Sequence, residues 1–447
     1  MPAGAMPGDR SRVSVRARSL ALPLVACAVL VTGLGASAAP REHAPVFLGS
    51  MLAAAILLAL AARALGAPGQ VGEPSLRWIV GGAAILRIAT LMAPVSLSDD
   101  VHRYLWDGAL LGAGHDPYAL RPADAIGLAG LDASDLSRLN SPHYFTIYPP
   151  LAQLVFALGA AIPLDEARGL RLLFVLSDLI AIALLARLLD RLERPRIWAL
   201  AYAWHPLAFW ETGAGGHTEA LMLPLVLAAL DEALDDRPAR ASVWLGLAAS
   251  TKLTALVFVP VLAAFAWRRR GPRALASAPL APLVLIATFI PFYRASLWPN
   301  LRASLSLFTA DFSFDAPIYY ALRHALGYRE GLTGPVDGTV MPLMAIATLL
   351  CVAGSSALQT GESRRFLAGL LASIVALLLF SRVLHPWYVL PALALGSLLP
   401  WRPIVLFALL VPLSYLAYSI GHEPAWLMAA QFAPFLITIV LEHRRLA

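Results

Sequence analysis

The chain has 447 residues, of which 59% are hydrophobic and only 14% are charged, and its mean hydropathy is +0.70. This composition is too apolar for a soluble domain, and no polar linker divides the chain, so we predict one integral membrane domain over residues 1–447. The net charge of +6 comes from scattered arginine clusters and forms no basic stripe, which argues against nucleic-acid binding.

Apolar runs close to the length of a membrane-crossing helix recur along the whole chain. Continuous Leu, Ala and Val runs favour helices, because the strands of a membrane barrel would alternate. We therefore predict an all-α polytopic transmembrane bundle of about 13 or 14 helices. The predicted spans are 19–38, 46–65, 77–95, 147–163, 169–189, 197–211, 218–235, 243–267, 275–293, 340–358, 365–381, 386–400, 402–420 and 424–441.

Residues 1–39 also resemble a secretory signal. Arginines at 10, 12, 16 and 18 precede an apolar stretch, and A-S-A-A at 36–39 precedes Pro40. Cleavage and retention both stay open, and we favour retention as the first span. The predicted orientation of the later spans is the same in both cases.

Arginine clusters predict the orientation, because short loops rich in Arg stay cytoplasmic. The N-terminal arginines, Arg268–Arg270, Arg364–Arg365 and Arg444–Arg445 can all lie on one side of the membrane. We therefore predict a multi-pass cell-membrane protein with cytoplasmic termini. Two long loops, 96–146 and 294–336, then lie on the extracytoplasmic side, together with the turns that hold His385 and His422.

One part of the chain conflicts with this orientation. Counting one crossing per span places the arginine-rich segment 187–196 outside. We interpret the conflict as a broken or re-entrant segment. The favoured candidate is 243–267, which carries Ser250, Thr251 and Lys252 near its middle.

The first long loop begins with D-D-V-H-R-Y-L-W-D-G at 99–108, directly after an apolar span. Tyr104 and Trp106 suit an interfacial helix that lies at headgroup depth. A carboxylate at that depth is partly desolvated and has a like-charged neighbour, and both effects raise its pKa toward that of a general base. The alternative is structural, with Asp99 capping the helix and Arg103 forming exposed helix pairs.

Further polar motifs follow in order along the chain: H-D-P-Y at 115–118, Y-P-P-L at 148–151, G-G-H-T-E at 215–219, S-T-K-L-T at 250–254 and H-P-W-Y at 385–388. With the first-loop motif, this ordered set resembles the membrane glycosyltransferases of the GT-C superfamily. The similarity is greatest to the bacterial polyprenyl-phosphate-mannose-dependent branch. That branch includes glycosyltransferase family 87, once called domain of unknown function 2029, and the phosphatidylinositol mannoside mannosyltransferases. The resemblance covers about residues 77–400, and His102 departs from the branch's aromatic pattern.

The resemblance implies a GT-C-like fold with interfacial helices in the first loop and an extracytoplasmic active site. An Asp of that loop would deprotonate the acceptor hydroxyl, and we favour Asp99 with Asp100 as the alternative. A sugar, mannose by the closest likeness, would pass with inversion from a polyprenyl-phosphate donor to a glycolipid, lipid or glycan acceptor. Besides that donor, the acceptor and membrane lipids, the resemblance implies no metal and no other cofactor.

The candidate residues for binding substrate or donor phosphate are Arg103, Tyr104, His217, Lys252, Arg382, His385, Trp387 and Tyr388. Lys252 is the only lysine of the chain and lies in an apolar segment, where a charge is costly and usually functional. Structural alternatives stay open: Lys252 snorkels or pairs, His217 belongs to a connecting turn, and the aromatics of H-P-W-Y anchor the chain at the interface.

The second long loop carries aromatic side chains within D-F-S-F-D at 311–315 and at Tyr319 and Tyr320. These are suited to cover a sugar acceptor, because flat aromatic faces pack against sugar rings. The alternative is an amphipathic helix that rests on the membrane.

Two other classes of function stay open, namely a transporter or lipid-linked glycan flippase, and a catalytically inactive envelope scaffold. A proton-coupled carrier usually has carboxylates inside its spans, and here Asp178 and Asp231 are the chief candidates. Cys27 and Cys351 both fall in predicted spans, so we expect buried free thiols and neither a disulfide nor a metal site.

Overall fold

The computed structural model describes residues 7–37, 40–65, 74–95, 97–164, 167–306, 312–327 and 336–446. Asp311 and the end of the A-S-A-A motif lie outside these residues. Within them every regular element is helical, and an isolated parallel bridge joins Phe314 to Val383. The prediction of an all-α fold is confirmed.

The first part of the chain forms α1 (Pro7–Ser37), α2 (Ala44–Leu65), α3 (Leu76–Leu91), α4 (Asp100–Gly112), α5 (Ala133–Ser137), α6 (Pro150–Ala160) and α7 (Arg168–Arg191). The middle forms α8 (Leu200–Ala203), α9 (Pro206–Trp210), the π-helix η3 (Glu211–Gly215), α10 (Glu219–Leu234), α11 (Pro238–Ala249), the 3-10 helix η4 (Leu253–Phe258), α12 (Val259–Arg270), α13 (Leu280–Phe289) and α14 (Leu297–Ser306). The last part forms α15 (Pro317–Ala325), α16 (Val336–Ala357), α17 (Ser363–Leu379), the 3-10 helix η8 (Pro386–Val389), α18 (Leu390–Leu398), α19 (Arg402–Leu410), α20 (Leu416–Ile420) and α21 (Ala425–Leu446).

Six helical segments of the described residues are long and apolar enough to cross a membrane: Ala44–Leu65, Arg168–Arg191, Pro272–Phe292, Gly338–Ala357, Arg402–Ile420 and Ala425–Glu442. Shorter apolar helices lie beside them at Ala21–Ser37, Pro150–Ala160 and Pro386–Leu398. Other predicted spans are divided. The predicted span 197–211, for example, contains most of the 3-10 helix η2 (Arg196–Ala199), then α8, α9 and the first residue of η3.

The helices pack into a bundle with a lipid-compatible outer surface. Leu349 and Leu350 on α16 are among the many apolar side chains that face outward. Cys27 and Cys351 lie on this exposed surface of α1 and α16, so the expectation that both are buried was wrong. An apolar helix surface can face lipid as well as protein, and the sequence pattern does not distinguish the two.

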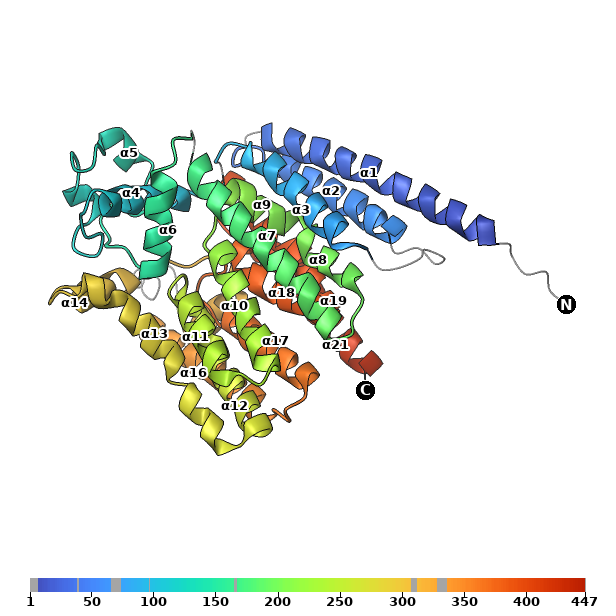
Figure 1. Cartoon of the computed structure of the whole chain (residues 1–447). Helices are drawn as coiled ribbons and strands as arrows, with labels where there is room; N and C mark the ends of the chain where they lie inside the picture. The colour runs from blue at the N-terminus through green and yellow to red at the C-terminus, as the bar shows by residue number, and fades with distance from the viewer. Residues whose placement is uncertain are drawn as a thin grey trace.

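The loop helices lie together at one end of the molecule. Figure 1 shows α4, α5 and α14 on the left, whereas both termini lie toward the right, and α1, α2 and α3 form a layer along one flank. The segments predicted to be extracytoplasmic are thus grouped, away from the two ends of the chain.

The predicted break within 243–267 is confirmed. Helix α11 ends at Ala249 and η4 begins at Leu253. The carbonyl oxygen of Ser250 accepts hydrogen bonds from the backbone N–H groups of Leu151 and Ala152 in the first turn of α6, at 3.0 and 3.2 Å. The Ser250 carbonyl, which a continuous helix would pair within itself, therefore joins the end of α11 to the start of α6. Lys252 lies at this junction.

Candidate functional site

The two adjacent aspartates at the start of α4 have different surroundings. The guanidinium of Arg41 donates to both carboxylate oxygens of Asp99 at 3.1 Å, and the side chains of this pair are 43% and 36% exposed. The Asp100 side chain is 23% exposed and turns inward. Asn140 donates to one of its oxygens at 3.2 Å, and the other lies 4.0 Å from Nδ1 of His217.

Tyr104 supports Asp100 from one turn further along α4. Its hydroxyl lies 3.5 Å from Oδ2 of Asp100, and its ring stacks on Phe156 of α6 with a centroid separation of 4.5 Å. The backbone of α6 comes this close because position 108 is glycine, where a Cβ would lie only 2.3 Å from the carbonyl oxygen of Phe156. Packing of α4 on α6 thus fixes the direction of the Asp100 carboxylate.

Arg103 has structural partners on a different side of α4. Its Nε donates to the buried carboxylate of Asp107 at 2.9 Å, and its Nη1 donates to the carbonyl oxygen of Ser141 at 3.0 Å. Gln153 of α6 donates to the second oxygen of Asp107 at 3.3 Å. This network joins the first loop to α4 and α6, so Arg103 is not brought to the group around Asp100.

His217 reaches Asp100 from a tight turn after η3. Gly216 has a φ of +67°, in the region that favours glycine, and a Cβ there would lie 2.9 Å from the side chain of Arg171. Nε2 of His217 lies 3.2 Å from the carboxylate of Glu211, which also accepts a hydrogen bond from Tyr415 at 2.6 Å. The turn thus places a buried imidazole between two carboxylates.

Burial decides the charge of the two histidines in the site. It lowers the pKa of His217 to about 4, although the charges of Asp100 and Glu219 act in the other direction. It lowers the pKa of His385 to about 3, with smaller effects of the same sign from His217 and Lys252. At neutral pH both rings are therefore neutral, and each offers one N–H donor and one acceptor.

A continuous stack of rings runs through the site. Trp387 lies between His217 and His385, with centroid separations of 3.7 and 4.3 Å and interplanar angles of 7° and 6°. Phe314 extends the stack, 4.9 Å from His385. The order of the described rings is therefore His217, Trp387, His385 and Phe314.

The second loop reaches this stack by backbone pairing. The N–H of Phe314 donates to the carbonyl oxygen of Arg382 at 3.1 Å, and the N–H of Leu384 donates to that of Phe314 at 2.8 Å. The guanidinium of Arg382 is buried and lies over the ring of Tyr319 at 4.9 Å. Arg382 thus lies behind the stack, where it ties the second loop to the H-P-W-Y segment.

Lys252 supplies the cation of the site. It forms an ion pair with Glu219 at the start of α10, and its Nζ lies 4.3 Å from the ring centroid of Tyr388. The Lys252 side chain is 19% exposed and that of Glu219 is 2% exposed. Among the described residues, Oε2 of Glu219 is buried and accepts no hydrogen bond.

The structure therefore gathers seven of the predicted residues into one group: Asp100, Tyr104, His217, Lys252, His385, Trp387 and Tyr388. Sequence reasoning missed Glu211, Asn140 and Arg41. Glu211 had a usable signal, because a carboxylate next to the apolar run A-F-W is costly without a role. Asn140 and Arg41 stand in ordinary polar loop sequence. Within the described residues no group of three or more His, Cys, Asp or Glu side chains is arranged to hold a metal ion.

Known proteins match this chain over much of its length. Residues 19–268, more than half of the chain, match the family model described as alpha-(1->6)-mannopyranosyltransferase, N-terminal domain. A probable alpha-(1->6)-mannopyranosyltransferase of Mycolicibacterium smegmatis is 30% identical over 154 residues, which is 33% of this chain and 27% of that relative. Alpha-(1->6)-mannopyranosyltransferase A of Mycobacterium tuberculosis is 26% identical over 405 residues, which is 81% of this chain and 76% of that relative. The predicted resemblance to mannosyltransferases is confirmed, and the chain belongs to the alpha-(1->6)-mannopyranosyltransferase family.

Proposed function

We propose that this membrane protein transfers a mannosyl group from a polyprenyl-phosphate donor to a glycolipid, lipid or glycan acceptor, with inversion and with Asp100 as the general base. The observation that carries the proposal is a group of neighbouring side chains from segments far apart in sequence. Asp100 lies 4.0 Å from the buried imidazole of His217, this ring stacks on Trp387, and the lone lysine, Lys252, lies over the ring of Tyr388. Family membership supports the sugar and the class of reaction.

The surroundings of the two aspartates support Asp100 over Asp99, which was favoured from sequence. The Arg41 guanidinium occupies both oxygens of Asp99 in an exposed ion pair. Among the described residues, the hydrogen-bond donors to the Asp100 carboxylate are a side-chain amide and a tyrosine hydroxyl, so this carboxylate can still accept a proton. In the proposed step, the acceptor hydroxyl gives its proton to Asp100, and the hydroxyl oxygen forms a bond to the anomeric carbon.

The bond from the anomeric carbon to the lipid phosphate breaks in the same step, and the phosphate leaves with the electron pair from the opposite face. Phosphate is a good leaving group, so the protein must supply donors for its charge more than a strong acid. Lys252 and the N–H group of His385 are the proposed donors, whereas His217 lies between the carboxylates of Asp100 and Glu211. This chemistry uses no metal, and we propose none.

A lipid-linked donor also fits a site built among membrane helices. The polyprenyl chain requires apolar surface, and the helices around the site expose apolar side chains outward. We propose that the reaction occurs on the extracytoplasmic side of the cell membrane. The grouping of the loop helices away from both termini supports this side, because the arginine clusters near the termini are predicted to be cytoplasmic (Figure 1).

The intramembrane carboxylates do not favour a proton-coupled carrier. Asp178 is fully buried and accepts hydrogen bonds from Arg87 and Tyr202. Asp231 forms ion pairs with Arg187 and Arg191. Both are neutralised by arginines, which suits structural roles.

The direct test is transfer by the full-length protein in lipid nanodiscs. The donor would be polyprenyl-phosphate [14C]mannose and the acceptor an α-1,6-linked mannose oligosaccharide, with GDP-[14C]mannose as the comparison donor. We expect label to enter longer oligosaccharides from the lipid donor alone, with no loss on addition of EDTA. Transfer only from GDP-mannose would overturn the proposed donor, and no transfer from either would overturn the proposed reaction.

A further inference from the structure

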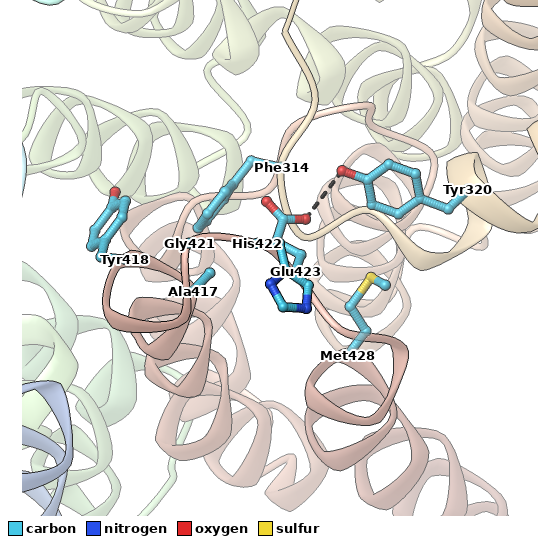
Figure 2. A pocket seen from close by; sticks show the side chains of 8 residues that line it. All are labelled: Phe314, Tyr320, Ala417, Tyr418, Gly421, His422, Glu423 and Met428. Carbon is cyan, nitrogen blue, oxygen red and sulfur yellow. Dashed lines mark hydrogen bonds between the residues drawn. The ribbon is translucent and has the colours of Figure 1, made fainter. Parts of the chain in front are cut away.

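A pocket of about 460 Å³ lies beyond Phe314, at the end of the ring stack. Figure 2 shows its lining residues: Phe314, Tyr320, Ala417, Tyr418, Gly421, His422, Glu423 and Met428. They come from the second loop, α15, α20, the turn before α21 and α21 itself. Its volume lies within the roughly 300–1,000 Å³ of typical small-molecule sites.

The lining selects for a neutral, hydroxyl-rich ligand. None of the described residues that line the pocket is a lysine or an arginine, so it lacks the cations that a phosphate requires. Phe314 and Tyr418 offer aromatic faces, with ring centroids 6.2 Å apart. Glu423, His422 and Tyr320 supply polar groups. Aromatic faces beside a carboxylate suit a pyranose ring, which is apolar on its C–H faces and carries hydroxyl groups around its edge.

The carboxylate of Glu423 is held in place through one of its oxygens. Oε2 accepts hydrogen bonds from the Tyr320 hydroxyl at 3.0 Å and from the backbone N–H of Asp315 at 2.9 Å. Figure 2 shows the other oxygen pointing away from Tyr320, toward the side where Phe314 and Tyr418 lie. A fixed acceptor thus faces Phe314 within the pocket lining.

The pocket adjoins the proposed catalytic group by two routes. Phe314 is the end of the stack that leads through His385 and Trp387 to His217. On the other side, Tyr418 lies under the guanidinium of Arg41, 5.4 Å from the ring centroid, and Arg41 pairs with Asp99. Phe314 therefore belongs both to the pocket lining and to the row of rings that reaches His217 beside Asp100.

We infer that the pocket lined by Phe314, Tyr418 and Glu423 binds the inner sugars of a neutral mannose-oligosaccharide acceptor, while the terminal sugar presents its hydroxyl to Asp100. The assignment of the terminal sugar rests on the proposed function. The assignment of the pocket rests on its own lining. It implies an acceptor that already carries several mannose units.

Binding is measured apart from catalysis by saturation-transfer difference NMR on the full-length protein in nanodiscs, with α-1,6-mannotriose as the probe. We expect binding by the unaltered protein, and binding weakened roughly tenfold by Tyr418→Ala and by Glu423→Gln. Tyr418→Phe keeps the ring and should bind as the unaltered protein does. Tyr293→Ala removes a tyrosine that is 73% exposed and outside the pocket lining, and it should change nothing.

Asp100→Asn separates the two proposals, because it should lose transfer and keep mannotriose binding. Absence of binding by the unaltered protein would overturn the pocket assignment, as would unchanged binding by Tyr418→Ala and Glu423→Gln that remain folded by size-exclusion chromatography. Binding with the expected variant pattern, but without transfer of any mannose donor, would leave the pocket assignment standing and overturn the proposed reaction.

Discussion

Lys252 and Glu219 form a pair in which one partner is almost inaccessible to solvent. Replacement of Lys252 by Met leaves the Glu219 carboxylate, which is 2% exposed, without its cation. Loss of one partner of such a buried pair costs about 3–5 kcal/mol. We therefore expect Lys252→Met to lower the thermal midpoint of the purified protein.

The double variant Lys252→Met with Glu219→Gln separates structure from chemistry. It removes both charges, so most of the lost stability should return. If Lys252 acts on the leaving phosphate, transfer remains lost in the double variant. Recovery of transfer together with stability would show that the pair is only structural.

Because the carboxyl group of Asp315 is buried, we expect the stability of the protein to depend on pH. Burial raises the pKa of this carboxyl to about 8, and the neighbouring Glu423 adds to the shift. In the unfolded chain an Asp titrates near pH 4, so between about pH 4 and 8 the folded chain holds a proton that the unfolded chain releases. Stability should therefore fall as pH rises through that window.

The variant Asp315→Asn removes this ionisation. Asn also tolerates the positive φ of +48° at this position. Thermal midpoints recorded from about pH 5 to pH 8 should fall less steeply for Asp315→Asn than for the unaltered protein. Parallel curves for the two proteins would contradict the assignment.

The choice between Asp99 and Asp100 marks the limit of prediction at the residue scale. Adjacent residues point in different directions, and which one turns inward depends on where the helix begins, which sequence patterns locate only to within a few residues. Here the helix begins at Asp100. The partner that occupies Asp99 is Arg41, which lies 58 residues away in another segment.

At the scale of elements, α4 has two glycines with opposite environments. A Cβ at position 108 would lie 2.3 Å from the carbonyl oxygen of Phe156, whereas one at position 112 meets nothing within 4 Å. Gly108→Ala should push α4 away from α6, displace Asp100, cost about 1–3 kcal/mol and reduce transfer.

Gly112→Ala is the matched control, and it should keep transfer and leave stability equal or raised by up to about 1 kcal/mol. Thermal midpoints and transfer rates of the two variants check this contrast. Equal behaviour would show that contact between α4 and α6 does not position the site.

Local sequence predicted some elements and missed others for physical reasons. The break at Ser250–Lys252 was predicted because the arginine-rich segment 187–196 conflicts with the orientation unless one span is broken, and these polar side chains lie near the middle of an apolar run. The pairing of Phe314 with Arg382 and Leu384 was missed, because such contacts join distant segments and leave no periodic pattern. The π-helix that places Glu211 beside His217 was missed for a related reason. It begins at the last residue of the predicted span 197–211, which the structure divides into shorter helices.

At the scale of the whole molecule, the proposed orientation is tested by cysteine accessibility in intact cells. In a background of Cys27→Ala and Cys351→Ala, a cysteine at exposed Ser134 of α5 should react with a membrane-impermeant maleimide. A cysteine at exposed Arg364 should react only after the cells are opened. The reverse pattern would place the proposed active site in the cytoplasm.

The proposed reaction depends on Asp100 as the base, and the most direct test is the transfer rate of the matched variants Asp100→Asn and Asp99→Asn. Asn keeps the size of the side chain and removes the proton acceptor. We predict that Asp100→Asn lowers the turnover rate by about 10²–10⁴-fold, the usual contribution of a general base. Asp99→Asn should lose only an exposed ion pair with Arg41 and keep most of the activity. Loss of transfer in Asp99→Asn, with Asp100→Asn still active, would contradict the account.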